Sequence, residues 1–323
     1  MNPDRRTLLG GAMLAGAVAG LSTAVKAQTA PATVEVLPLW PSTPPGAEAV
    51  TVTERVSDRA PAAAAARDRA IEHTRNPTLT VVRPANPNGA AILIFPGGAY
   101  VRATLDKEGY DVAQWFAARG YTGFVCAYRF PGDGWAAGPD TPLQDAQRAV
   151  RLIRSKAADY GLQQNRIAVM GFSAGGHMAA SILTRYDDKV YEAVDAVDAL
   201  PARPDAGCLM YPVISFTPTL MHEGSRRQMI GANPTEEQID KYSTEKHVTA
   251  QTPPTFLCHA ADDNGVPWAN SIAFFSALKA AKVATEMHLF EKGGHGFGLR
   301  GVEGKPAYAW PDLFARWAAD KGV

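Results

Sequence analysis

The sequence contains little cysteine and shows no excess of either charge. Its 323 residues include 32 basic and 32 acidic side chains, so it lacks the electrostatic footprint of a protein that binds nucleic acid or an anionic membrane surface. The three cysteines, Cys126, Cys208 and Cys258, each lie within or at the end of an apolar run. An odd number of cysteines in buried strands predicts core residues and no disulfide.

Metal-binding patterns are also missing. The seven histidines form no HExxH motif and no paired-histidine spacing, the arrangements that hold zinc in many hydrolases. We therefore expect neither a metal nor a cofactor. With balanced charge, a neutral or modestly charged small molecule is the simplest partner to expect.

The first 27 residues have the composition of an export signal. Arg5 and Arg6 precede an apolar run rich in glycine and alanine, from Leu8 to Val25, and small residues follow it at Ala27. The paired arginines favour the twin-arginine route and a periplasmic or secreted protein. The alternative is an N-terminal membrane anchor, but the run is barely long enough to span a bilayer and glycines interrupt it. After cleavage we expect no membrane association.

The remainder of the chain divides into an extended arm, residues 28–78, and a catalytic domain, residues 79–323. The arm is rich in Pro, Ala, Thr and Ser and has no sustained periodic pattern. In the domain, apolar strands alternate with helices, which predicts a mostly parallel, doubly wound α/β sheet with helices on both faces. Residues 185–204 and 215–252 break this alternation and could wall a pocket. The expected strands are 79–83, 90–95, 123–128, 167–170, 207–211, 255–259 and 286–290, and the expected helices are 107–119, 142–160, 269–281 and 307–320.

The segment Gly171–Gly175 reads Gly-Phe-Ser-Ala-Gly between an expected strand and an expected helix. This is the nucleophile elbow G-x-S-x-G, in which the serine occupies the tip of a turn too tight for side chains at the flanking positions. Ser173 is the predicted nucleophile. The alternative interpretation is a glycine-rich turn with a capping serine.

A serine hydroxyl needs a base to activate it and an acid to orient that base. Asp263 follows the strand 255–259 and lies four residues before Pro267, so we predict that it is the acid, with Asp262 as the alternative. His295, between glycines after the strand 286–290, is the predicted base. His177 and His259 flank the same region and are interpreted as packing residues or as residues that support the catalytic side chains from behind.

The developing negative charge on a carbonyl oxygen requires hydrogen-bond donors. The amide of Ala174, directly after the serine, is one predicted donor. The others are the amides of Gly97 and Gly98, in a glycine turn at the position of the HGGG-type loop. Here the loop reads Pro-Gly-Gly-Ala at residues 96–99, so it departs from that motif at both ends.

Together these motifs resemble the α/β-hydrolase carbohydrate esterases of the acetylxylan and feruloyl esterase kind. The likeness extends from about Leu39 to Trp317 and includes residues 96–100, 107–109, 142–148, 171–175, 211–213, 262–267 and 294–298. The resemblance implies an α/β-hydrolase fold and an exported serine esterase. Its substrate would be a small-molecule or oligosaccharide ester that carries acetyl or other small acyl groups. The enzyme would hydrolyse this ester through an acyl-enzyme on Ser173.

Alternatives within this reading are a general carboxylesterase or a feruloyl esterase. A peptidase of the prolyl-oligopeptidase type lacks room for its propeller domain before residue 90, and a non-catalytic relative would usually have lost a triad member. The sequence predicts no oligomeric state. Aromatic residues beside the catalytic loops are candidate contacts for a sugar or ferulate ring, namely Tyr100, Trp135, Trp268 and Phe297.

Overall fold

A computed structural model describes residues 35–323 of the chain. The predicted export signal, residues 1–27, and the start of the arm, residues 28–34, lie outside the described residues. Within the described part, no helix is long and apolar enough to cross a membrane. All three cysteines are buried and unpaired.

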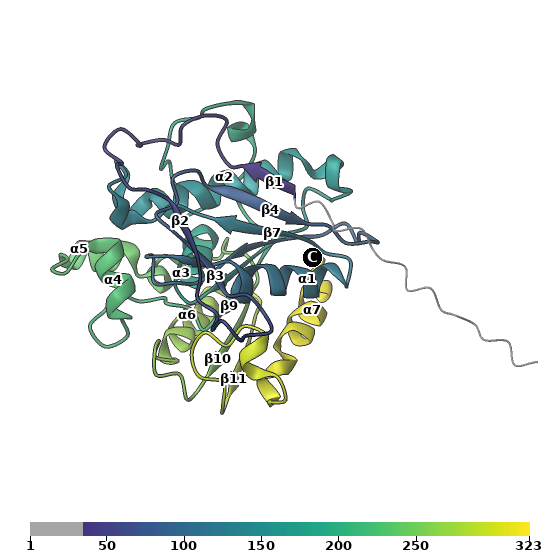
Figure 1. Cartoon of the computed structure of the whole chain (residues 1–323). Helices are drawn as coiled ribbons and strands as arrows, with labels where there is room; N and C mark the ends of the chain where they lie inside the picture. Colours follow the sequence, from purple (N-terminus) through teal and green to yellow (C-terminus); the bar gives the residue numbers. More distant parts are fainter. Residues whose placement is uncertain (1–34) are drawn as a thin grey trace, which may run out of the picture. The chain divides into compact units, whose positions relative to one another are not determined.

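The centre of the fold is an eight-stranded sheet in the order β1-β4-β7-β5-β8-β9-β10-β11 (Figure 1). The six strands from β7 to β11 in this order are parallel, whereas β1 and β4 pair antiparallel at one edge. This arrangement confirms the predicted mostly parallel α/β sheet. The strands are β1 (Glu35–Pro38), β4 (Thr78–Val82), β5 (Ala91–Phe95), β7 (Thr122–Ala127), β8 (Ile167–Phe172), β9 (Ala206–Met210), β10 (Thr255–Ala260) and β11 (Thr285–Phe290).

The central strands are apolar along their whole length because both faces of the sheet are covered. In β5 every residue is buried, and alternate side chains enter two separate cores: Leu93 packs on one face and Ile92 on the other. Three helices cover the first face and two cover the second (Figure 1). The first three are α2 (Thr141–Ser155), α3 (Ala174–Thr184) and α6 (Ala269–Ala280); the other two are α1 (Asp111–Ala117) and α7 (Trp310–Asp320).

Three expected helices are shorter than predicted because each has a turn of a different type at one end. The helix expected at 107–119 begins with a π-helical turn, Asp106–Tyr110, and α2 is followed by the separate 3₁₀ turn Ala157–Tyr160. A 3₁₀ turn, Pro306–Ala309, precedes α7. The π-helical turn has a functional consequence, because it buries Glu108 beside the loop that follows β5.

The arm contains strands that its composition did not reveal. β1 forms the edge of the main sheet, and β2 (Arg55–Asp58) and β3 (Arg69–Glu72) join β6 (Ala103–Thr104) in a second, three-stranded sheet. Each of these strands has four residues or fewer, too short to give a recognisable alternating pattern. The small sheet brings the arm to the loop after β5.

A buried ion pair fixes the arm to the domain. Arg129 and Asp145 are fully buried and approach within 2.8 Å, and the Trp40 indole N–H donates to the same carboxylate, also at 2.8 Å. The guanidinium also donates to the Pro45 carbonyl at 2.8 Å. The charges therefore have hydrogen-bonding partners on both sides, as buried ion pairs require.

The two excursions from the alternating pattern contain short helices. Residues 215–252 include α4 (Glu223–Ile230) and α5 (Glu236–Tyr242), which project together from one end of the sheet in Figure 1. Residues 185–204 contain the 3₁₀ turn Ala196–Ala199. Of the two excursions, 215–252 contributes a residue, His222, to the pocket described below.

We expect Asp145→Ala to lower the free energy of unfolding by about 3–5 kcal/mol, because it leaves the Arg129 charge buried without a counterion. Equilibrium denaturation in urea measures this change. The matched control is Asp320→Ala, which removes an exposed partner of Lys321 and should change stability by less than about 1 kcal/mol. Equal effects of the two substitutions would contradict the anchoring role of the buried pair.

Candidate active site

Ser173 lies at the turn between β8 and α3, with φ 54° and ψ −118°. Such a positive φ is unfavourable for a residue with a side chain and is kept only where the surroundings enforce it. The surroundings here are backbone: a Cβ at Gly171 or at Gly175 would come within 2.1 Å of a carbonyl oxygen. The two glycines of the predicted elbow are therefore required for strand and helix to meet at this angle.

The structure brings Ser173, His295 and Asp263 into one hydrogen-bonded line. The loops after β10 and β11 carry the acid and the histidine. Ser173 Oγ lies 2.8 Å from His295 Nε2, and His295 Nδ1 lies 2.7 Å from Asp263 Oδ2. Because Nδ1–H of His295 donates a hydrogen bond to the carboxylate, Nε2 carries no proton and is free to accept the serine proton. This is the geometry that a general base needs.

Asp263 is held by more than the histidine. Its Oδ1 accepts hydrogen bonds from the amides of Gly265 and Val266 at 2.8 and 2.9 Å. His259, fully buried, donates from Nε2 to Asp263 Oδ2 at 3.2 Å. Burial acts to raise the pKa of Asp263, but hydrogen bonds from His259 and His295 outweigh it and hold that pKa well below its usual range. The carboxylate therefore remains charged when His295 becomes protonated.

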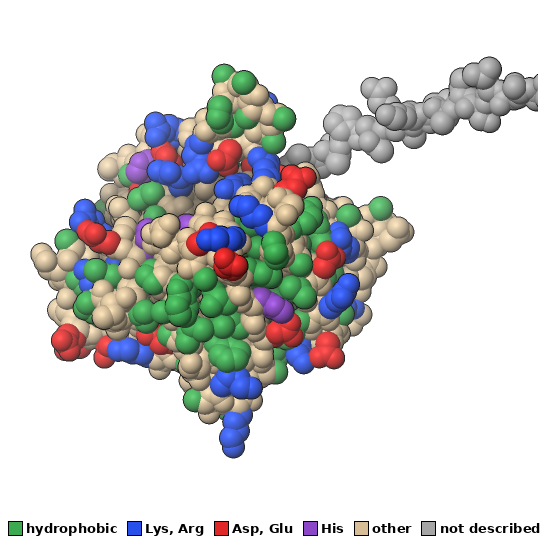
Figure 2. All heavy atoms as spheres, turned by 90° about the horizontal axis from the view of Figure 1, so that it is seen from below, with side chains coloured by type: hydrophobic (Ala, Val, Ile, Leu, Met, Phe, Trp, Pro, Cys, Tyr) green, Lys and Arg blue, Asp and Glu red, His purple; other side chains and the backbone are tan. Residues whose placement is uncertain are grey.

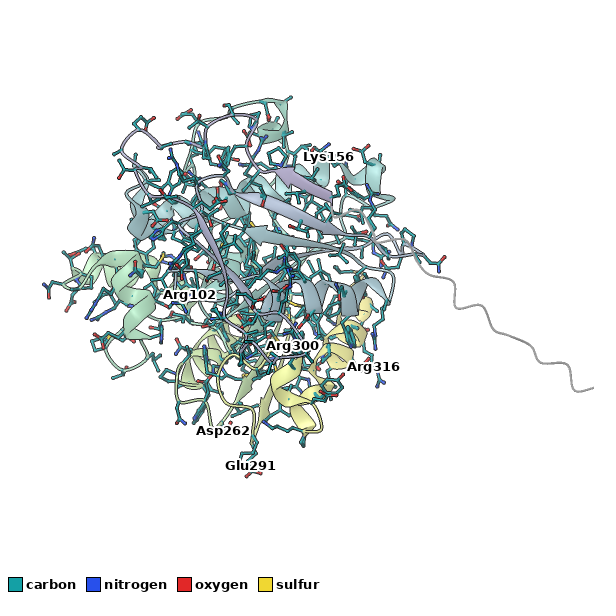
Figure 3. All side chains as sticks on the ribbon, in the orientation of Figure 1. Arg102, Lys156, Asp262, Glu291, Arg300 and Arg316 are labelled. Atoms are coloured by element: carbon teal, nitrogen blue, oxygen red, sulfur yellow. The ribbon has the colours of Figure 1, made fainter. Side chains whose placement is uncertain are left out.

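Asp262, the alternative acid, has a different task. Its Oδ1 accepts the amides of Gly293 and Gly294, both at 2.8 Å. Figure 3 shows Asp262 at the lower edge of the molecule, beside Glu291, which follows β11. Asp262 thus fixes the loop that carries His295, whereas Asp263 accepts the hydrogen bond from the imidazole.

The predicted oxyanion donors differ in what their amides do. The N–H of Gly97 donates to Glu108 Oε2 at 2.9 Å, so it is already engaged and is not available as an oxyanion donor. Among the described residues, the amides of Gly98 and Ala174 donate to no other group, and the same holds for Ala99. Gly98 and Ala99 line the pocket described below, and Ala174 directly follows Ser173 in the chain. Ala99 is thus a further candidate donor, which the sequence analysis did not name.

The carboxylate of Glu108 joins the loops of the site. Its Oε2 accepts from Gly97 N and from Thr104 Oγ1 at 2.8 Å, and its Oε1 accepts from the Tyr211 hydroxyl, also at 2.8 Å. Tyr211 Oη in turn accepts the amide of Gly298 at 2.9 Å. One buried carboxylate therefore connects the loop after β5 with the end of β9 and the histidine loop.

Ser173 and His295 open on a pocket of about 350 Å³. The other polar side chains of its lining are Arg59, Arg102 and Thr104 from the region of the small sheet, Lys107, Glu108 and His222. His222 Nδ1 accepts the amide of Ser225 at 3.1 Å, which leaves Nε2 as the protonated nitrogen. Burial and the nearby His295 lower the pKa of His222, so it stays neutral at physiological pH.

None of the four aromatic residues predicted to contact substrate lines this pocket. Tyr100 and Phe297 are 1% exposed, because their rings point into the two cores. Trp135 is buried over the Arg129 guanidinium, 4.6 Å from it, and faces a separate hollow beside the arm. Trp268 is 42% exposed at the start of α6.

His177 lies behind the nucleophile as a packing residue. Its Nδ1 accepts from the Tyr100 hydroxyl and its Nε2 donates to the Tyr242 carbonyl, both at 2.8 Å. The side chain is fully buried, and burial lowers its pKa from 6.5 to about 4. A neutral imidazole thus links the loop after β5 to α5.

Sequence reasoning missed the charged lining of the pocket. Lys107 and Glu108 belong to a segment that the resemblance included, and a glutamate on the buried side of a helix was a signal that could have marked Glu108. Arg59 and His222 had no such signal, since each comes from a segment without a periodic pattern. Within residues 35–323, no three His, Cys, Asp or Glu side chains gather in a way that could hold a metal ion.

On the face of the molecule shown in Figure 2, neither sign of charge dominates. Basic and acidic side chains are interspersed over the face shown in Figure 2, in keeping with the balanced composition of the sequence. The concentration of basic side chains around the pocket is thus a local feature.

A mostly parallel sheet that presents a serine, an acid and a histidine in this chain order is the architecture of the α/β hydrolases. The BD-FAE family matches residues 80–278, more than half of the chain. The chain belongs to the BD-FAE family, and the predicted resemblance to α/β-hydrolase carbohydrate esterases is confirmed.

Among curated proteins, the chain is 37% identical over 205 residues to endo-1,4-beta-xylanase B of Butyrivibrio fibrisolvens, covering 64% of this chain and 32% of that protein. It is 34% identical over 221 residues to an acetylxylan esterase of Xylanibacter ruminicola, covering 67% and 42%. The chain thus spans less than half the length of these two relatives.

Solved structures match over nearly their whole length. An acetyl ester-xyloside bifunctional hydrolase from Caldicellulosiruptor lactoaceticus is 33% identical with a TM-score of 0.68, covering 89% of this chain and 96% of that one. The carboxylesterase Cest-2923 from Lactobacillus plantarum is 25% identical with a TM-score of 0.62, covering 83% and 98%.

The low pKa of His177 predicts a pH dependence of stability. The unfolded chain takes up a proton near pH 6.5, whereas the folded chain resists it until about pH 4, so stability falls as the pH decreases between these values. The loss should reach about 3 kcal/mol at pH 4, at roughly 1.4 kcal/mol per pKa unit. Urea denaturation from pH 7 to pH 4 should show a shallower loss for His177→Gln than for wild type. Parallel curves would contradict this role.

Proposed function

We propose that this protein is an exported serine esterase that removes acetyl or other small acyl groups, with plant cell-wall carbohydrate as its substrate, in the manner of an acetylxylan esterase. The observation that carries the proposal is the line Ser173, His295, Asp263 opening on a pocket beside unengaged backbone amides. The named relatives, an acetylxylan esterase and an acetyl ester-xyloside hydrolase, support the substrate class.

In the proposed mechanism, Ser173 Oγ attacks the ester carbonyl while His295 Nε2 accepts its proton. Asp263 stabilises the imidazolium that forms, because its charged carboxylate accepts a hydrogen bond from Nδ1–H. The amides of Gly98, Ala99 and Ala174 bind the negative oxygen of the tetrahedral intermediate. His295 then protonates the leaving alcohol, and the C–O bond to it breaks to give an acyl group on Ser173.

Water completes the cycle. His295 removes a proton from a water molecule as its oxygen attacks the acyl carbonyl, and the same imidazole returns the proton to Ser173 as the carboxylic acid leaves. The products are the free alcohol and the acid. A pocket of about 350 Å³ is at the small end of ligand sites, which favours a short acyl group.

A general carboxylesterase is the second candidate. The observation that favours it is the match with the carboxylesterase Cest-2923 over 98% of that chain. The name of that protein mentions no carbohydrate. Feruloyl esterase activity has less support, because the four aromatic residues expected to stack on a ferulate ring do not line the pocket.

The experiment compares hydrolysis of 4-nitrophenyl acetate, butyrate and octanoate with release of acetate from acetylated xylan and of ferulate from methyl ferulate. Ser173→Ala should lower kcat by at least about 10³-fold on every substrate, since the nucleophile is lost. The matched control is Ser276→Ala, at an exposed position of α6, which should retain wild-type rates.

Preference for acetate and acetylated xylan would support the carbohydrate esterase. Preference for octanoate with no acetate release from xylan would leave a general carboxylesterase. Full activity of Ser173→Ala would refute the serine mechanism itself.

We also propose export by the twin-arginine route, on the sequence of residues 1–27, which lie outside the described structure. When the full-length sequence is expressed in a bacterial host, the protein should be found outside the cytoplasm and should lack the signal segment. Replacing Arg5 and Arg6 together by lysine should retain the unprocessed protein in the cytoplasm. Unchanged processing of that variant would point to the general secretory route.

A further inference from the structure

Three basic side chains lie around the pocket, and the proposed deacetylation does not use them. Arg59 follows β2, Arg102 directly precedes β6, and Lys107 lies in the π-helical turn before α1. In Figure 3, Arg102 is on the side of the molecule where α4 projects, whereas Lys156, after α2, is at the opposite side. An uncharged acetyl ester gives no reason for such a lining.

Two of these cations are weakly paired: Arg102 has one long ion pair, and Lys107 has none among residues 35–323. The carboxylate nearest to Arg102 is that of Glu72, 3.6 Å from its Nε, and Glu72 is also bound by Arg55. The Nε of Arg102 is buried and donates to no acceptor within residues 35–323. In the same part of the chain Lys107 forms no ion pair. Arg59 is different, because Asp68 binds its guanidinium at 2.6 Å.

Glu108 is the one carboxylate in the lining, and it does not serve as a counterion for Arg102 or Lys107. Both of its oxygens accept hydrogen bonds from other groups, namely the amide of Gly97 and the hydroxyls of Thr104 and Tyr211. The Arg102 side chain is 37% exposed and lines the pocket together with Lys107. The pocket therefore offers positive charge to whatever enters it.

We propose that the preferred substrates are esters that carry a carboxylate close to the scissile bond, and that Arg102 and Lys107 bind it. This rests on the proposed esterase function and narrows its substrate class. Arg102 suits a carboxylate because its planar guanidinium offers several N–H donors, and Lys107 adds a point charge. The carboxylate can belong to the alcohol, as in an acetylated oligosaccharide with a uronic acid branch, or to the acyl group, as in a half-ester of a dicarboxylic acid.

Two matched pairs of substrates separate these sources. The first pair is an acetylated xylo-oligosaccharide with a glucuronic acid branch and the same oligosaccharide with a neutral glucose branch. The second pair is the 4-nitrophenyl half-ester of succinic acid and its methyl-capped diester. In at least one pair the acidic member should have a kcat/KM roughly three- to tenfold higher at low salt, mainly through a lower KM. The preference should shrink as ionic strength rises.

Lys107→Met and Arg102→Gln should each lower the ratio of acidic to neutral kcat/KM by roughly two- to fivefold, and the double variant should abolish the preference. The control Lys279→Met removes an exposed lysine from α6 and should leave the ratio unchanged. Because the readout is a ratio between two substrates of one enzyme preparation, partial loss of folding does not alter it.

A wild-type enzyme that hydrolyses the neutral and acidic members of both pairs equally would overturn the anionic subsite and leave the esterase standing. A preference that survives in the double variant would also overturn it, since other residues would then bind the carboxylate. Failure to hydrolyse any member, together with inactivity on 4-nitrophenyl acetate, would instead refute the proposed function.

Discussion

The geometry of the site depends on close backbone contact around Ser173. A Cβ on Gly171 or Gly175 would overlap a carbonyl oxygen, and a Cβ on Gly97 would lie 2.9 Å from that of Ser173. The end of β8, the start of α3 and the loop after β5 therefore meet with no room for a methyl group. This contact holds the serine at a φ of 54° and sets the nucleophile beside the unengaged amides. His295 and Asp263 are in turn aligned with Ser173 by hydrogen bonds.

Glu108 holds loops from different strands in fixed positions relative to one another. Burying a carboxylate is unfavourable unless its oxygens accept hydrogen bonds. Here the donors come from three segments, through Gly97, Thr104 and Tyr211, and Tyr211 Oη also accepts the amide of Gly298. The loop after β5, which carries the proposed oxyanion donors, and the loop that carries His295 are thus joined through the side chains of Glu108 and Tyr211.

The sequence predicted the sheet and the Ser-Asp-His line because both leave local signals. Strands buried on both faces read as continuous apolar runs, and Asp263 could be separated from Asp262 by its spacing to Pro267. Side-chain direction leaves no comparable signal. Tyr100 and Phe297 adjoin catalytic loops, yet their rings are buried. Likewise, the pocket position of Arg59 depends on pairing between strands of four residues or fewer, which no pattern in the arm indicates.

The proposed chemistry and the proposed selectivity of this pocket depend on different parts of the chain. Ser173, Asp263 and His295 stand on loops at the carboxyl ends of the parallel strands, where the sheet fixes them. The basic lining instead comes from Arg59, after β2, and from Arg102 and Lys107, on either side of β6. Glu108 joins the two regions through its hydrogen bonds with Gly97, Thr104 and Tyr211. None of the three basic side chains takes part in the hydrogen bonds between Ser173, His295 and Asp263. A change of charge in the lining should therefore alter which esters bind and leave the geometry of proton transfer unchanged.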